Sequence, residues 1–188
     1  FGEMLHREFP GGVDAPGQPV LGIVPAGVVP YYAELPAVDM LGLNDAWTAK
    51  HGLQYPFYFP GHVRTSTIDY LRRRNVSLLL GSMREDDVVP GRRAYRLSEI
   101  ADLQPGGNLR DLPPSAKVLE IPTGTPNRTW QFVYLEQNDK VDAAVERNGW
   151  KLYPITRECR VTDLVDPGVG GILLDIAKAF AERTCPGL

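Results

Sequence analysis

The sequence predicts an α/β fold with a mixed, mainly parallel sheet, flanking helices and a long Gly/Pro-rich insertion. One apolar run covers residues 20–24 and a second ends at Asp39, and both lead into polar, glycine-containing loops, as neighbouring parallel strands of an open sheet do. Further along the chain, apolar runs alternate with segments of helical periodicity. With 188 residues, 43% of them hydrophobic, the chain is long enough to bury a sizeable core.

Apolar spacing and capping residues predict the other elements in order. Asp45 is expected to cap the helix that follows it, and Gly149 to end the helix before it. Aromatic residues between Pro56 and Pro60 predict a loop over 52–63, because proline interrupts a regular helix. Helices are expected over 3–8, 46–51, 67–74, 139–148 and 171–184, and further strands over 76–80, 117–121, 130–135 and 150–155.

Turn-forming residues indicate the domain organisation. Residues 1–18 are predicted to be a linker that contains a short helix, and 19–188 a single α/β domain. Residues 85–114 are polar and rich in proline and glycine, so we expect a long loop insertion with one helical turn near 98–102.

Charge and hydropathy exclude several classes of partner. The net charge of −3 argues against nucleic acid, because binding to phosphates needs a basic face. No apolar run in the sequence approaches the length of a membrane span, and no signal peptide is visible. Because the chain begins at Phe1 rather than methionine, we expect a processed product or a piece of a longer protein.

Motifs for catalysis and cofactors are missing from the sequence. There is no glycine-rich nucleotide-binding motif and no G-x-S-x-G nucleophile elbow. Oxygen and imidazole ligands do gather at Asp39, Asn44, Asp45, His51 and His62, but no His-x-His, HExxH or Cys pair fixes a metal geometry. The sequence predicts no catalytic residue, no cofactor and no metal.

A mixture of aromatic and polar residues suggests contact with carbohydrate. Sugars are held by aromatic faces with carboxylates, amides and arginines nearby, and the sequence places such residues around one expected sheet edge. The alternative is that the aromatic rings cover the end of the sheet and bury apolar area. The candidate ligand-binding residues are Tyr31, Tyr32, Asp39, Asn44, Asp45, His62 and Arg64.

Three segments carry a resemblance to a known group of proteins. These are 26–32 (AGVVPYY), 38–45 (VDMLGLND) and 60–62 (PGH), which occur in this order. Together they resemble the soluble C-terminal region of bacterial polytopic membrane glycosyltransferases of the GT-C type, a group that includes arabinofuranosyltransferase-like and protein-mannosyltransferase-like proteins. In that group, a membrane part takes sugar from a polyprenyl-phosphate donor and an extracytoplasmic domain follows it.

The resemblance implies a non-catalytic, extracytoplasmic domain on the periplasmic side of the cytoplasmic membrane. Its expected partners are a carbohydrate or lipid-linked sugar and the membrane-embedded part of the same polypeptide. Export would allow a disulfide between Cys159 and Cys185. Two alternatives stay open: a free-standing α/β metal-assisted hydrolase that acts on a small polar substrate, and a purely structural domain that packs on a membrane partner.

Overall fold

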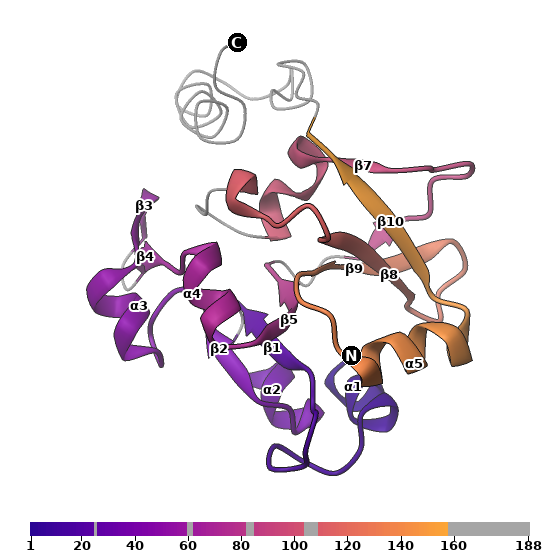
Figure 1. Ribbon diagram of the computed structural model, residues 1–188, viewed down its shortest axis with the longest axis horizontal. Helices are drawn as coiled ribbons and strands as arrows, with labels where there is room; N and C mark the ends of the chain where they lie inside the picture. Colours follow the sequence, from indigo (N-terminus) through magenta and orange to yellow (C-terminus); the bar gives the residue numbers. More distant parts are fainter. Residues whose placement is uncertain (25, 60–61, 82–84, 104–108, 158–188) are drawn as a thin grey trace.

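A computed structural model shows an α/β fold built on one eight-stranded sheet and a separate two-stranded hairpin (Figure 1). It describes residues 1–24, 26–59, 62–81, 85–103 and 109–157. The helical elements are α1 (Gly2–Glu8), α2 (Val28–Ala33), α3 (Ala46–His51), α4 (Ile68–Arg73), the 3-10 helices η1 (Leu97–Leu103) and η2 (Leu109–Asp111), and α5 (Asp139–Asn148). The strands are β1 (Val20–Ile23), β2 (Ala37–Asp39), β3 (Leu53–Phe59), β4 (His62–Thr65), β5 (Val76–Leu80), β6 (Asp86–Asp87), β7 (Tyr95–Arg96), β8 (Lys117–Pro122), β9 (Arg128–Tyr134) and β10 (Lys151–Thr156).

The sheet is mixed, with the strand order β2-β1-β5-β9-β8-β10-β7, and β6 pairs with β9. Strand β1 pairs in parallel with both β2 and β5, so the two apolar runs that the sequence singled out are neighbouring parallel strands. Strand β9 runs antiparallel to β5 and β8, and β10 antiparallel to β8. The α/β class with a mixed sheet and flanking helices is therefore confirmed.

Buried side chains form two clusters, one on each face of the sheet. Helices α1, α2 and α5 cover one face, and α4, η1 and η2 cover the other. Strand β5 is buried at every position and sends side chains to both clusters, as a strand covered on both faces does. Figure 1 shows α1 and α5 side by side under the sheet, where Arg147 of α5 donates to Glu8 of α1 at 2.7 Å.

Helix ends form where the sequence supplies capping side chains. The Asp45 carboxylate accepts a hydrogen bond from the Thr48 amide, and Asn138 accepts from the first turn of α5. Gly149 adopts φ 63° at the end of α5, a conformation that glycine reaches without a steric penalty. These caps agree with the predicted positions of α3 and α5.

The aromatic segment 52–63 differs from the predicted loop, because most of it forms the β3–β4 hairpin. Proline cannot donate a backbone hydrogen bond, but the outer edge of a two-stranded hairpin needs no donor. Pro56 is therefore compatible with β3. The hairpin projects from the edge of the molecule beside α3 (Figure 1).

Two further segments also belong to the core rather than to loops and linkers. In the described part of 85–114, four elements form, and apolar side chains of this segment are buried: Tyr95, Leu97, Ile100, Leu103, Leu109 and Leu112. At the N-terminus, Leu5 and Phe9 of the predicted linker are buried under the sheet. The sequence-based prediction relied on the proline and glycine content of these segments. It did not assign these residues to the core, because the apolar residues of both segments are separated by polar ones.

Gly52 joins α3 to the hairpin at a point where two backbone segments nearly touch. A Cβ atom there would lie 2.6 Å from the carbonyl oxygens of both Thr48 and Thr65. Because these are backbone atoms, they cannot move aside like a flexible side chain. We expect Gly52→Ala to lower the free energy of unfolding by about 2 kcal/mol, measured by urea denaturation.

The matched control is Gly124→Ala. A Cβ atom at Gly124 would meet nothing within 4 Å, although its φ of 91° is also unfavourable for alanine. A loss of stability at Gly52 no larger than that at Gly124 would contradict the close approach between α3 and β4.

Candidate functional site

The loop that follows β2 is held together by the Asp39 carboxylate. This side chain is buried, and its Oδ1 accepts from the Leu41 amide at 2.9 Å. Its Oδ2 accepts from the Asn44 amide at 2.7 Å and from the Asn44 side chain at 3.4 Å. Both carboxylate oxygens are thus used to shape the loop, so Asp39 and Asn44 bind each other.

Asp45, at the end of the same loop, connects α3 to α4. Its Oδ1 accepts from the Thr48 amide at 2.8 Å, and its Oδ2 accepts from the Tyr70 hydroxyl at 2.8 Å and from Arg74 Nη1 at 3.2 Å. The Tyr70 ring stacks on Trp47 with 3.9 Å between ring centroids. These contacts bind the N-terminus of α3 to the C-terminal end of α4.

The electrostatic surroundings keep Asp45 ionised. Burial raises the pKa of this carboxyl, but the hydrogen bonds from Thr48 and Tyr70 and the charge of Arg74 outweigh burial, and the net pKa is lowered. An ionised carboxylate that accepts three hydrogen bonds from the protein is a structural anion. This arrangement does not supply a general acid at neutral pH.

Two further candidates lie on β4. Arg64, on β4, donates from Nη1 to the Gly52 carbonyl at 3.0 Å and so closes the base of the hairpin. His62 begins β4, and its side chain lies outside the described part of the structure. In the residues that the structure describes, no three His, Cys, Asp or Glu side chains gather as a metal site.

Tyr31 and Tyr32 lie on α2 and are exposed, with 77% and 50% of their surface accessible. The two rings meet edge to face, with 5.2 Å between their centroids. A shallow hollow of about 440 Å³ lies beside them and is also lined by His6, Val13, Pro30 and Glu34. The structure therefore brings the tyrosine pair together with a carboxylate from the end of α2, and not with the loop over 39–45.

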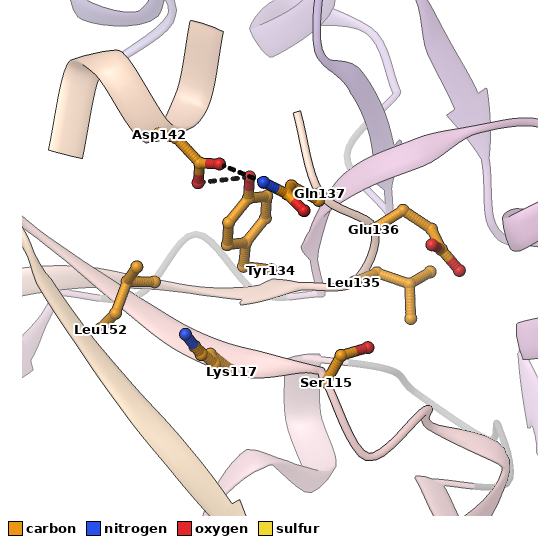
Figure 2. Close-up of a pocket in the computed structure, with 8 residues that line it drawn as sticks. All are labelled: Ser115, Lys117, Tyr134, Leu135, Glu136, Gln137, Asp142 and Leu152. Carbon is orange, nitrogen blue, oxygen red and sulfur yellow. Dashed lines mark hydrogen bonds between the residues drawn. The ribbon is translucent and has the colours of Figure 1, made fainter. Parts of the chain in front are cut away.

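Sequence reasoning missed two hollows that lie near the start of α5. The first, of about 440 Å³, is drawn in Figure 2; Ser115, Lys117, Tyr134, Leu135, Glu136, Gln137, Asp142 and Leu152 line it. The second, of about 620 Å³, shares Glu136 and Gln137 with the first and adds residues from the starts of β1 and β5. No sequence motif marks them, because strands β5, β8 and β9 bring their residues together from distant parts of the chain.

Hydrogen bonds inside the hollow of Figure 2 occupy Asp142, one of its two acidic residues. Asp142 Oδ1 accepts from the Tyr134 hydroxyl at 2.8 Å, and Asp142 Oδ2 accepts from Gln137 at 2.9 Å. Burial and the hydrogen bond to Asp142 raise the pKa of Tyr134 far above its ordinary value. Tyr134 therefore stays a neutral hydrogen-bond donor to Asp142 at neutral pH.

Comparison with known proteins places the described fold within one family. The family described as "Domain of unknown function (DUF8728)" matches residues 2–153, which run from α1 into β10. The chain belongs to this family. No curated protein and no solved structure matches it.

Two predictions concern residues that the structure does not describe. Cys159 and Cys185, and the helix expected over 171–184, lie outside the described residues. Among the helices of the described residues, none is both long and apolar enough to cross a bilayer.

Proposed function

We propose that this chain is the extracytoplasmic domain of a cell-envelope membrane glycosyltransferase of the GT-C type. In this proposal, the domain is not catalytic itself and helps to position the glycan acceptor or the polyprenyl-phosphate sugar donor. The observation that carries the proposal is the exposed Tyr31–Tyr32 pair beside Glu34. Aromatic rings of this size favour burial, yet α2 presents both rings to solvent next to a carboxylate. Such a surface suits the apolar face and the hydroxyl groups of a sugar ring.

The resemblance in residues 26–32, 38–45 and 60–62 supports the same proposal. The first of these segments contains the tyrosine pair. The second forms the loop whose internal hydrogen bonds set the spacing of α3 from β2. In this proposal, the first segment contacts sugar and the second is a scaffold.

Removing the aromatic rings tests the sugar contact. We expect Tyr31→Ala combined with Tyr32→Ala to weaken the binding of a cell-wall oligosaccharide about tenfold, equal to about 1.4 kcal/mol, measured by calorimetric titration. The melting temperature should stay close to that of the unmodified protein, because both rings are largely exposed.

The matched control keeps the rings and removes only the hydroxyl groups. Tyr31→Phe combined with Tyr32→Phe should retain most of the affinity, because stacking on a sugar depends on the ring. Equal affinity of the alanine variant and the unmodified protein would refute the sugar contact at α2.

The gene upstream of the codon for Phe1 provides a second test. A membrane glycosyltransferase of this type predicts several apolar segments of membrane-spanning length before this domain. Finding none of them would refute the assignment to a membrane enzyme, and it would leave the sugar titration to be judged separately.

A purely structural domain that packs on a membrane partner is a second candidate, favoured by a different observation. The polar groups at the carboxyl ends of β1 and β2 are paired within the protein, as Asp39 and Asp45 show. In that case, neither tyrosine variant would alter sugar binding, because the unmodified protein would bind no sugar.

A further inference from the structure

Three exposed aliphatic side chains lie on the β3–β4 hairpin and in the loop before α3. Leu53 and Val63 lie on the two strands of the hairpin, with 37% and 51% of their surfaces exposed. Leu53 pairs in register with Thr65, and Val63 lies on β4 between Arg64 and His62, where the register of the hairpin shifts. Leu43, in the loop before α3, is 60% exposed.

Basic side chains lie on α3, β4 and α4, the elements that form the hairpin or adjoin it in the sequence. Lys50 and His51 occupy the last turn of α3, which leads into the hairpin, and both are exposed. Arg64 is bonded to the base of the hairpin at Gly52. The Arg73 guanidinium lies 5.7 Å from the centre of the Trp47 ring, and the centres of the Trp47 and His51 rings are 5.6 Å apart. Arg73 of α4 therefore lies against α3.

Acidic groups do not balance these cations locally. Residues 40–75 contain five lysine and arginine residues but only two acidic ones, Asp45 and Asp69, whereas the whole chain has a net charge of −3. Asp45 is buried and bonded to Arg74, and Arg72 is paired with Glu136. The excess of positive charge therefore comes from Lys50, Arg64 and Arg73. The hairpin therefore belongs to a locally positive part of an acidic protein.

We propose that this part of the molecule, the hairpin surface, binds the headgroup region of an anionic lipid bilayer. It is formed by Leu43, Leu53 and Val63 with Lys50, His51, Arg64 and Arg73. Aliphatic side chains gain free energy by entering the acyl boundary, and lysine and arginine are attracted to anionic headgroups. A nucleic acid would satisfy the cations but not the exposed aliphatic groups.

The position of the hairpin fits the same partner. The hairpin projects beside α3 at the edge of the molecule (Figure 1), so a flat surface can reach it. This inference rests on the proposed function only in that the domain works beside a membrane.

Vesicle sedimentation tests the proposal with the 188-residue protein. The unmodified protein should bind vesicles of phosphatidylcholine with phosphatidylglycerol and bind pure phosphatidylcholine at least tenfold more weakly, and added salt should weaken the binding. Leu53→Ser combined with Val63→Ser should lower binding at least tenfold. Lys50→Glu combined with Arg73→Glu should lower it more, since each cation contributes about fivefold.

The matched control is Val88→Ser combined with Val89→Ser, which removes two exposed valines that lie near β6. This variant should bind anionic vesicles as the unmodified protein does. Equal loss of binding in the control, equal binding to both kinds of vesicle, or no binding to either would overturn the proposal. Because no glycan is present, such a failure would leave the sugar contact at Tyr31 and Tyr32 untouched.

Discussion

Glu120→Ala is expected to lower the free energy of unfolding by about 3 kcal/mol, because it breaks a buried charged cluster. Glu120 lies on β8 with 3% of its surface exposed and accepts a hydrogen bond from the Tyr95 hydroxyl. Arg92 Nε lies 3.9 Å from the same carboxylate, and the Arg92 guanidinium lies 3.9 Å from the centre of the Tyr95 ring. Removing the carboxylate leaves the Tyr95 hydroxyl buried without its acceptor.

This cluster binds the segment around β7 to the centre of the sheet. Arg92 also donates to Glu99 of η1 at 2.8 Å, and Tyr95 lies on β7. Burial raises the pKa of Tyr95, and the hydrogen bond to Glu120 raises it further, so Tyr95 remains a donor at all moderate pH values. The ion pairs therefore stabilise the position of the segment around β7, in which no long run of apolar residues occurs.

Urea denaturation at neutral pH measures the effect, and two variants serve as controls. Glu120→Gln keeps an acceptor for Tyr95 and should cost less, about 1 kcal/mol. Glu146→Ala removes an exposed glutamate of α5 and should change the free energy of unfolding by less than about 0.5 kcal/mol. If Glu120→Ala resembled Glu146→Ala, the buried cluster would not be a source of stability.

The parts of the fold that local patterns determine were predictable from the sequence. The run over 20–24, the cap at Asp45 and the glycine at 149 each act within a few residues, and the structure places β1, α3 and the end of α5 accordingly. Helix α2 was missed, because its six residues include Pro30 and two tyrosines and show no clear period.

Long-range contacts explain what the sequence did not reveal. Tyr95 and Glu120 are 25 residues apart, and no local pattern links a tyrosine in a glycine-rich segment to a glutamate on a strand. For the candidate site, the sequence placed Tyr31 and Asp39 at one sheet edge, but α2 turns the tyrosine pair toward His6 and Glu34. The residue types were readable from the sequence, whereas the direction in which a helix presents them was not.

Asp45→Ala is expected to lower the free energy of unfolding by about 2–3 kcal/mol. The substitution removes the cap of α3, which contributes about 1 kcal/mol, and leaves the Tyr70 hydroxyl without its acceptor. Thr67→Ala is the matched control, because Thr67 only caps α4 through the Tyr70 amide and should cost about 1 kcal/mol. Urea denaturation of both variants at neutral pH provides the comparison.

The pH dependence of stability adds an independent test of the role of Asp45. Its folded pKa is lowered, so its contribution is present above the unfolded pKa of about 3.9 and is lost as the pH falls through the folded pKa. Asp45→Asn should keep most of the cap but remove this acid dependence. Acid titration of unfolding in both proteins would show it as a shallower loss of stability for the variant as the pH falls below the unfolded pKa.

The same variant separates a scaffold from a ligand-binding residue. If Asp45 only joins α3 to α4, Asp45→Asn should bind a cell-wall oligosaccharide as well as the unmodified protein does, whereas the alanine variant of Tyr31 and Tyr32 should not. A loss of sugar affinity in Asp45→Asn without a change in melting temperature would instead place this carboxylate against the ligand. Because the Asp45 oxygens already accept three hydrogen bonds from protein groups, we expect the loss of stability and not the loss of binding.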